Sequence, residues 1–247
     1  MTVQFNSPEL APPPNHHQGI HIGHPWPLGA SLTSRGVNFS VVAPLATRIE
    51  LLLFADGEAS EPARVVELDQ RHRSADHWHV EVEGLGLGSC YGYRAFGPLQ
   101  PGGHGFNPSK VLLDPCARAI AGWQSYQRGG AVGAAPNTGH CLKGVVTERD
   151  RFDFSHAPRP RHSWQKSVIY ELHVGGFTQG PGCPVPAQLH GSLLGLIHTI
   201  PYLKDLGITT IELLPVMAFD PNDAPAGRHN YWGYSCLLYT SPSPRDR

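Results

Sequence analysis

VIYELHV (168–174), LLGLIHTIPYLKDLG (193–207) and ITTIELLPV (208–216) together predict the fold of the second half of the chain. The first and third segments are apolar runs of strand length, which suits burial on both faces of a parallel sheet. In the middle segment leucine and isoleucine recur every three or four residues, which is the period of one helical face. Strand, helix and strand in this order predict a parallel βαβ unit.

Two residues predict where the helix of this unit begins and ends. Pro201 cannot donate a backbone hydrogen bond within a helix, so the main helix is expected to begin close to it, with the proline in the first turn. Gly207 stands where a left-handed C-terminal cap belongs.

The first half of the chain has the period of β-strands. Apolar and polar residues alternate in VNFSVV (37–42) and in HWHVEVEG (77–84), while RIELLLF (48–54) and YGYRAFGP (91–98) have the length and composition of buried strands. Gly, Pro and Asp separate these runs, and no helical period intervenes. We predict an immunoglobulin-like antiparallel β-sandwich over residues 23–121, so that the whole chain has a multidomain fold, β followed by α/β.

The remaining segments lack such periods. Residues 1–22 contain three consecutive prolines and are expected to be a flexible lead-in. Residues 122–165 are rich in glycine and proline, and we expect an irregular connection that packs on a surface, because long structureless loops are uncommon inside compact domains. Residues 166–235 hold the βαβ unit and the aromatic loop after it.

Composition excludes several classes of partner. The net charge is −1 and charged residues make up 16% of the chain, which argues against nucleic acid or an anionic membrane as partner. No apolar run has the length of a membrane span or signal peptide. The five cysteines show no metal-type or redox-type spacing, and we expect reduced thiols in a cytosol or plastid stroma. We predict no cofactor and no metal site, and interpret His16, His17, His21 and His24 as part of the lead-in.

VIYELHVGGFT, PYLKDLGITTIELLPV and NYWGYS (230–235) resemble the beginning of the catalytic (β/α)8 barrel of glycoside hydrolase family 13, the α-amylase group, and within it the isoamylase-type glycogen debranching enzymes. PLGAS, GVNFSVVAP and FNPSKVLLDPCARAI resemble the family 48 carbohydrate-binding module that precedes that barrel. The resemblance covers about residues 23–235. It implies an α-glucan such as glycogen as the partner.

The resemblance also implies a retaining mechanism with an aspartate nucleophile and a glutamate general acid/base. A further aspartate helps to orient the distorted sugar, and in the family these three groups follow the fourth, fifth and seventh barrel strands, whereas the motifs of this chain reach the second. A (β/α)8 barrel takes about 250 residues. We therefore expect residues 166–235 to be the start of a truncated TIM barrel, the chain to be an N-terminal fragment, and the catalytic residues to lie downstream. Residues 236–247, CLLYTSPSPRDR, depart from the family pattern, and we interpret them as a non-native tail or else a divergent surface tail.

Carboxylates within the chain are expected to be structural. Glu171 and Glu212 fall inside the strand patterns, and Asp220 and Asp223 follow the second strand. A catalytic pair needs two carboxyls in different environments, one protonated and one ionised, and nothing in the spacing of these residues supplies that geometry. We predict hydrogen bonds to loops and helix ends instead.

The aromatic loop after the second strand holds the candidate substrate-binding residues Tyr231, Trp232 and Tyr234. Working loops of a barrel lie at the C-terminal ends of its strands, aromatic faces suit the apolar faces of glucose rings, and Gly233 permits close backbone approach. By resemblance, Tyr234 matches the tyrosine that stacks on the sugar beside the scissile bond, and Trp232 lines the same subsite. In the sandwich, Trp26, Trp78 and Trp123 are weaker candidates for a glycan platform. We expect Trp78 to pack in the core, because it alternates with Val80 and Val82.

The function predicted from these motifs is the hydrolysis of α-1,6 branch linkages of glycogen or a related α-glucan by the parent enzyme, with the fragment itself inactive. Two alternatives stay open. One is an α-1,4-glucan branching transferase or a trehalose-releasing hydrolase of the same family. The other is a non-catalytic α-glucan-binding protein. The sequence leaves the oligomeric state undecided.

Overall fold

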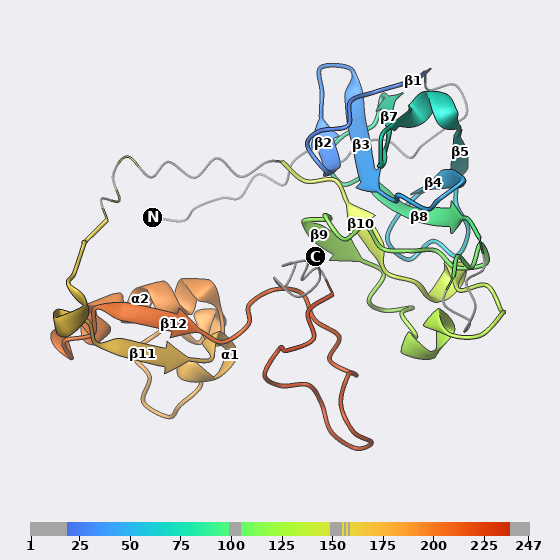
Figure 1. Ribbon diagram of the computed structural model, residues 1–247. Coiled ribbons are helices and arrows are strands. Elements are labelled where there is room, and N and C mark those ends of the chain that lie inside the picture. The colour runs from blue at the N-terminus through green and yellow to red at the C-terminus, as the bar shows by residue number, and fades with distance from the viewer. Residues whose placement is uncertain (1–18, 99–104, 149–154, 156, 158, 238–247) are drawn as a thin grey trace. The chain divides into compact units, whose positions relative to one another are not determined.

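A computed structural model gives the fold of residues 19–98, 105–148, 155, 157 and 159–237. The chain separates into two compact units, with the division after residue 150 (Figure 1). We describe each unit by itself and call them the first unit and the second unit.

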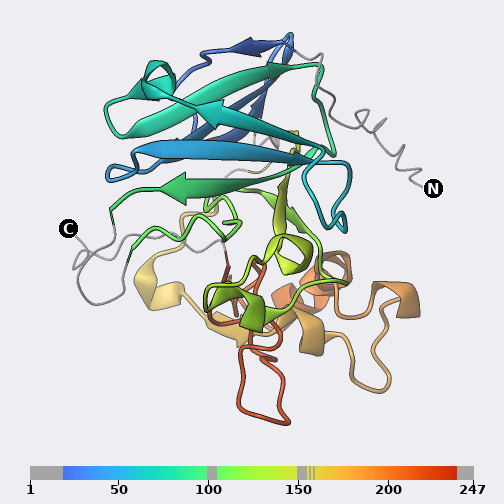
Figure 2. The ribbon, with the colours of Figure 1, turned by 90° about the vertical axis from the view of Figure 1, so that its right-hand side faces the viewer.

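The first unit consists of two antiparallel sheets, whose strands can be followed in Figure 2. The first sheet has the order β1-β7-β3-β2, with β6 also paired to β7, and consists of β1 (Ile20–His21), β2 (Gly29–Leu32), β3 (Gly36–Val42), β6 (Arg73–Ser74) and β7 (His77–Glu83). The second sheet has the order β5-β4-β8-β10-β9 and consists of β4 (Arg48–Phe54), β5 (Arg64–Leu68), β8 (Cys90–Phe96), β9 (Ala119–Ala121) and β10 (Lys143–Val145).

Alternate residues of the two sheets form one buried apolar core, as the strand periods predict. Val37 and Phe39 of β3, Val80 of β7 and Leu51 and Leu53 of β4 are almost completely buried in the same cluster. Side chains of a strand point alternately to its two faces, so the inner face of each sheet is apolar. The predicted antiparallel sandwich is confirmed.

The sandwich extends beyond the predicted boundary at residue 121. Strand β10 lies within the segment expected to be an irregular connection, and it pairs with both β8 and β9. A Cβ at Gly144 would lie only 2.8 Å from the Tyr91 ring, so glycine is what lets this strand approach β8 so closely. Lys143 beside it is fully buried, and its Nζ donates to Gly57 O at 2.8 Å. Three residues that include a lysine show no strand period, which is why the sequence did not predict β10.

Both ends of the chain carry corrections of the same kind. Gly19 and β1 belong to the predicted lead-in, yet β1 pairs with β7 and Glu83 N donates to Gly19 O. At the other end, Leu237 N donates to Ala218 O at 2.9 Å, so the predicted tail begins inside the fold of the second unit. The rest of both predictions, residues 1–18 and 238–247, lies outside the described residues.

The second unit contains a parallel strand pair connected through a helix. β11 (Ile169–Leu172) and β12 (Thr210–Leu213) pair in parallel, and α2 (Leu193–Asp205) lies between them in the sequence, so the predicted βαβ order is confirmed. The short helix α1 (Val174–Phe177) directly follows β11. Isolated 3-10 turns complete the two units: Gln70–His72, Arg128–Ala131, Thr138–His140, Trp164–Lys166 and Ala187–Leu189. With two strands among the described residues of this unit, its assignment to a (β/α)8 barrel stays a prediction.

The predicted start of α2 was wrong. The helix begins eight residues before Pro201, at an N-cap where the Ser192 hydroxyl accepts from Gly195 N, and the proline lies inside it. The helix continues through the proline because Leu196 and Leu203, on either side, are buried against the strands. Its end was predicted correctly. Gly207 has a φ of +87°, as a left-handed C-terminal cap requires.

A buried carboxyl stabilises the interior of the first unit. Asp114 is fully buried, and it accepts from the Tyr91 hydroxyl at 2.8 Å and from Cys116 N at 2.7 Å. Burial raises the pKa of Asp114, although these hydrogen bonds lower it in part. The folded protein therefore holds this proton to a higher pH than the unfolded chain does.

This shift predicts a pH-dependent difference between the wild type and Asp114→Asn. The protonated Asp114 carboxyl contributes to the free energy of unfolding. This contribution is lost as the pH rises from about 4 through the pKa of Asp114 in the folded protein, whereas the amide of the variant does not titrate. We expect the variant to gain stability relative to wild type across that range, measured by urea unfolding at a series of pH values. Glu61→Gln, at an exposed position, is the control and should show no such trend. A difference in the free energy of unfolding between Asp114→Asn and wild type that stays the same at every pH would contradict the raised pKa of Asp114.

Candidate functional site

The loop after β12 is shaped by an asparagine and a glycine. Asn230 N donates to Pro221 O at 2.9 Å, and its side-chain Oδ1 accepts from Gly233 N at 3.2 Å. Gly233 has a φ of +77°, and a Cβ there would lie 3.0 Å from Pro215 O. Only glycine adopts this conformation readily. These contacts hold the NYWGYS turn in one conformation.

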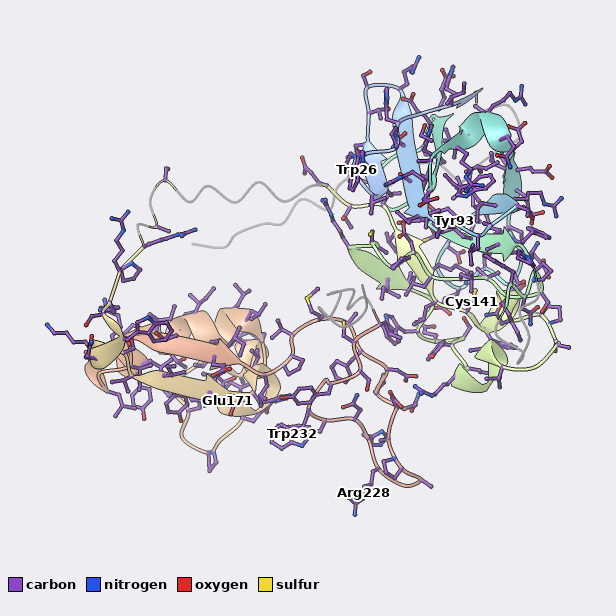
Figure 3. All side chains as sticks on the ribbon, in the orientation of Figure 1. Trp26, Tyr93, Cys141, Glu171, Arg228 and Trp232 are labelled. Atoms are coloured by element: carbon purple, nitrogen blue, oxygen red, sulfur yellow. The ribbon has the colours of Figure 1, made fainter. Side chains whose placement is uncertain are left out.

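The three predicted binding residues are all substantially exposed on this loop. Tyr231, Trp232 and Tyr234 expose 54%, 55% and 58% of their surfaces. The Tyr231 and Trp232 rings pack edge to face with centroids 5.4 Å apart, and Trp232 is labelled in Figure 3. Tyr234 makes no ring contact with either of them among the described contacts, so the structure brings two of the three together and leaves the third apart.

His173 completes the aromatic cluster, and sequence reasoning missed it. Its ring stacks on Tyr231 with centroids 4.4 Å apart and meets Trp232 edge to face at 5.9 Å. Nδ1 accepts from Gly176 N at 3.1 Å, which leaves Nε2 to donate to Tyr231 O at 2.9 Å. The imidazole thus connects the end of β11 to the loop after β12. Its position at the end of the first strand was the available signal, since neighbouring parallel strands end at the same edge of a sheet.

Tyr234 lies at a different part of the site, beside the strands. A cavity of about 600 Å³ is lined by Glu171, Glu212, residues 213–217 and residues 233–236. This volume is within the range of small-molecule sites, and most of the lining is apolar. The arrangement places one aromatic ring next to two carboxylates on an open surface.

Glu171 and Glu212 are brought side by side, which their separation in the sequence did not indicate. They are register partners on β11 and β12, so both side chains lie on the face of the sheet opposite α2, and Figure 3 labels Glu171. Parallel strands are about 4.8 Å apart. Among the described residues, neither carboxylate has a recorded hydrogen bond or ion pair. The two groups therefore occupy equivalent environments, unlike a general acid and a nucleophile, which must differ.

The other predicted carboxylates differ in burial. Asp220 is buried, and its Oδ1 accepts from Asn222 N at 2.8 Å, which is the structural role expected for it. Asp223 N donates to Asp220 O at 3.1 Å within the same turn. Asp220 therefore shapes the loop that leads to the aromatic cluster.

The three tryptophans of the first unit have different surroundings. Trp78 is fully buried and donates from Nε1 to Ala43 O at 3.1 Å, so its predicted core position is confirmed. Trp123 is 39% exposed and packs edge to face on Tyr126, with centroids 6.1 Å apart. Trp26 is 63% exposed and lies against the His77 ring.

Three further features concern only the part of the chain that the structure describes. No group of three His, Cys, Asp or Glu side chains is placed to hold a metal ion there. No helix in those residues is long and apolar enough to cross a membrane. All five cysteines lie in that part, Cys90 and Cys141 among them are buried, and Cys236 Sγ donates to Ala218 O at 3.0 Å.

The Glu171–Glu212 pair predicts a local gain of stability on neutralisation. Like charges directly opposite each other on neighbouring strands destabilise a sheet, by roughly 0.2–1 kcal/mol. Glu212→Gln should therefore slow amide exchange in β11 and β12, measured by hydrogen–deuterium exchange and mass spectrometry. Glu67→Gln is a matched control. Glu67 faces Glu50 on the neighbouring strand, but the Arg48 guanidinium lies 3.3 Å from the Glu67 carboxylate and 3.4 Å from that of Glu50, and its charge offsets their repulsion. Glu67→Gln should not slow amide exchange in β4 and β5. Equal slowing by the two variants, each in its own strand pair, would contradict the repulsion between Glu171 and Glu212.

The stacking of His173 on Tyr231 predicts how tightly the loop is held. His173→Ala removes the ring contacts to Tyr231 and Trp232 and the hydrogen bond to Tyr231 O. These contacts to the loop are together worth about 1–2 kcal/mol, so the open loop should become about tenfold more populated. Limited proteolysis by trypsin after the exposed Arg228 should accelerate by that factor. Cleavage after Arg161 in the same molecule is the internal control and should keep its rate. An unchanged ratio of the two rates would show that His173 does not hold the loop.

Comparison with known proteins identifies relatives of this chain. Residues 27–117 match the family Carbohydrate-binding module 48 (isoamylase N-terminal domain). The glycogen debranching enzyme of Erwinia tasmaniensis is 40% identical over 228 residues, which is 88% of this chain and 34% of that enzyme. The glycogen debranching enzyme of Pectobacterium atrosepticum is 39% identical over 229 residues, 89% of this chain and 34% of the enzyme. The chain thus spans about a third of the length of these relatives.

Solved structures agree on the fold. Apo pullulanase from Paenibacillus barengoltzii matches with a TM-score of 0.58 and 20% identity, over 80% of this chain and 28% of that one. The glycogen-degrading pneumococcal virulence factor SpuA matches with the same TM-score and identity, over 80% of this chain and 20% of that one. The solved structures share the fold of this chain, the curated glycogen debranching enzymes are similar to it over most of its length, and its residues 27–117 resemble carbohydrate-binding module 48.

Proposed function

We propose that this chain is part of a glycoside hydrolase that cleaves α-1,6 branch linkages of glycogen or a related α-glucan. The observation that carries the proposal is the 40% identity to a glycogen debranching enzyme, which extends over 228 residues and through both units. An odd number of cysteines without metal-type or redox-type spacing favours a reducing compartment, and we propose the cytosol.

The second unit is the start of the catalytic barrel in this proposal. Its β11–α2–β12 order and the parallel pairing of the strands are those of a (β/α)8 barrel. The candidate residues follow β12, at the C-terminal end of a strand, where such barrels bind substrate. Further strands of the complete protein supply the nucleophile and the general acid/base.

The aromatic loop contributes binding and orientation. Tyr234 stacks on the sugar beside the scissile bond, and the cavity that Tyr234 lines accepts the sugar ring. Tyr231 and Trp232 present a second aromatic surface, which His173 keeps in place. A neutral polymer is recognised by stacking on aromatic faces and by hydroxyl hydrogen bonds, so this site does not need a concentration of charge.

In the retaining reaction the aromatic loop binds the sugar, and the rest of the enzyme supplies the two catalytic carboxyl groups. A carboxylate attacks the anomeric carbon while a carboxylic acid protonates the glycosidic oxygen, and water later hydrolyses the glycosyl–enzyme ester. We do not assign Glu171 and Glu212 to this pair, because they face each other on one exposed side of the strand pair, whereas an acid and a nucleophile need different environments. Their part is to line the surface beside Tyr234.

Two alternatives predict different products. A branching transferase would move a glucan segment without a net gain of reducing ends, and a trehalose-releasing hydrolase would liberate a non-reducing disaccharide. The names of the relatives at 39–40% identity favour debranching. A non-catalytic glucan-binding protein would bind glycogen and release nothing even when complete.

Hydrolysis assays test the proposal directly. The complete protein that contains this chain should release linear α-glucans from glycogen, with retention of the anomeric configuration by NMR. The 247-residue chain alone should produce no reducing ends from glycogen or pullulan. Turnover by the chain alone would contradict our assignment of the chemistry to other residues, and a complete protein that only transfers chains would favour the branching alternative.

Tyr234 offers a residue-level test in the complete protein. Loss of the stacking ring in Tyr234→Ala should lower kcat/KM on glycogen at least about tenfold, equivalent to roughly 1.4 kcal/mol of transition-state binding. Tyr202→Ala is the matched control, because Tyr202 is an equally exposed tyrosine on α2, 59% against 58%. It should keep kcat/KM within about twofold. Equal losses in the two variants would contradict the role of Tyr234.

A further inference from the structure

Of the three candidate rings of the loop after β12, Tyr234 depends most on contacts of the backbone. Tyr231 and Trp232 contact each other and His173, whereas Tyr234 makes no ring contact and no side-chain hydrogen bond among the described residues. A side chain with few neighbours takes its direction from the backbone that carries it, since only its rotamer is left to vary. The contacts of that backbone therefore decide how the ring lies in the cavity that Tyr234 lines.

The side-chain amide of Asn230 binds this backbone at two points. Nδ2 donates to Tyr234 O at 2.5 Å, and Oδ1 accepts from Gly233 N at 3.2 Å. The Asn230 backbone N–H donates to Pro221 O at 2.9 Å, so the residue is itself anchored to an earlier part of the loop. An amide can make both side-chain contacts at once, because it carries an oxygen acceptor and an NH2 donor.

The peptide group that follows Tyr234 has a conformation that needs support. Ser235 has a φ of +66°, in the left-handed region that residues with a Cβ rarely adopt. Such a conformation costs free energy and persists where neighbouring contacts fix it. The Tyr234 carbonyl belongs to the peptide group that joins Tyr234 to Ser235, and Asn230 donates to this carbonyl. The hydrogen bond therefore acts where the backbone is strained.

We propose that Asn230 is a positioning residue for the proposed reaction. Its amide fixes the peptide group between Tyr234 and Ser235, and that peptide group directs the Tyr234 ring toward the sugar. The inference rests on the proposed function, because the direction of the ring affects turnover only where the ring stacks on the substrate. Asn230 acts on the reaction through Tyr234, and a ring displaced by about 1 Å lowers the rate because the sugar leaves its reactive orientation.

Cleavage by chymotrypsin tests the contact without an activity assay. Asn230→Asp keeps an oxygen that accepts from Gly233 N, but it replaces the donor to Tyr234 O with a carboxylate oxygen that repels the carbonyl. Cleavage of the 247-residue chain after Tyr234 should then accelerate about fivefold, because the peptide group leaves its fixed conformation more often. Cleavage after the exposed Trp164 in the same molecule reports an intact fold and should keep its rate.

Asn222→Ala is the matched control for this experiment. Asn222 is an exposed asparagine of the same loop, and its side chain has no recorded contact among the residues that the structure describes. The control should leave the rates of cleavage after Tyr234 and Trp164 unchanged. An unchanged rate after Tyr234 in Asn230→Asp, or an equal acceleration by Asn222→Ala, would overturn the inference.

Kinetics of the complete protein on glycogen separate a positioning residue from a structural one. Asn230→Asp should lower kcat/KM about five- to tenfold, and its combination with Tyr234→Ala should lose no more than Tyr234→Ala alone, because the two residues act as a unit. Losses that multiply in the double variant would overturn the role of Asn230 and leave the proposed function standing. Absence of hydrolysis by the complete wild-type protein would overturn the proposed function, while faster chymotryptic cleavage in Asn230→Asp would still support the contact with Tyr234.

Discussion

Apolar contact between α2 and one face of the β11–β12 pair organises the second unit. Leu172 of β11 and Leu196 and Leu203 of the helix are buried together. Because strand side chains alternate between faces, this contact leaves Glu171 and Glu212 on the opposite, open face. It also sets the two strands parallel and in register, so the loops that follow them emerge at one edge. One packing interaction thus orients both the carboxylates and the aromatic cluster.

Polar side chains have a comparable role in the first unit. Its apolar core holds the two sheets together, but several segments around that core have little regular structure. Buried groups fasten them. The Lys110 ammonium donates to three carbonyl oxygens between residues 130 and 135, and Lys143 fastens the turn at Gly57. Each interior charge or amide is stable only because a loop backbone completes its hydrogen bonds. The sandwich consequently has rigid loops as well as rigid strands.

These two kinds of contact hold aromatic rings in place at the surface of each unit. The chain carries little net charge, and its candidate contacts are aromatic rings on backbones held by hydrogen bonds. In the second unit, Asn230, Gly233 and His173 hold the rings. In the first unit, Asn38 and Ser40 hold the segment that carries Trp26. In both places the backbone that carries the rings is fixed by hydrogen bonds of the chain itself.

Much of the fold was determined by local pattern. Period-two strands predicted the sandwich and the core position of Trp78, and the change to a helical period predicted the βαβ order. The loop after β12 exposes Tyr231, Trp232 and Tyr234, and their role in binding a glucan stays a prediction.

Only tertiary structure decided which distant residues meet. β10 pairs with β8 because Gly144 fits over Tyr91, a contact that three residues of sequence cannot reveal. α2 extends back past Pro201 because burial on both sides outweighs the lost hydrogen bond. The stack of His173 on Tyr231 and the register of Glu171 with Glu212 depend on the alignment of two strands some forty residues apart. A sequence pattern states which face a side chain occupies, whereas pairing, register and exposure arise only when the faces are packed against one another.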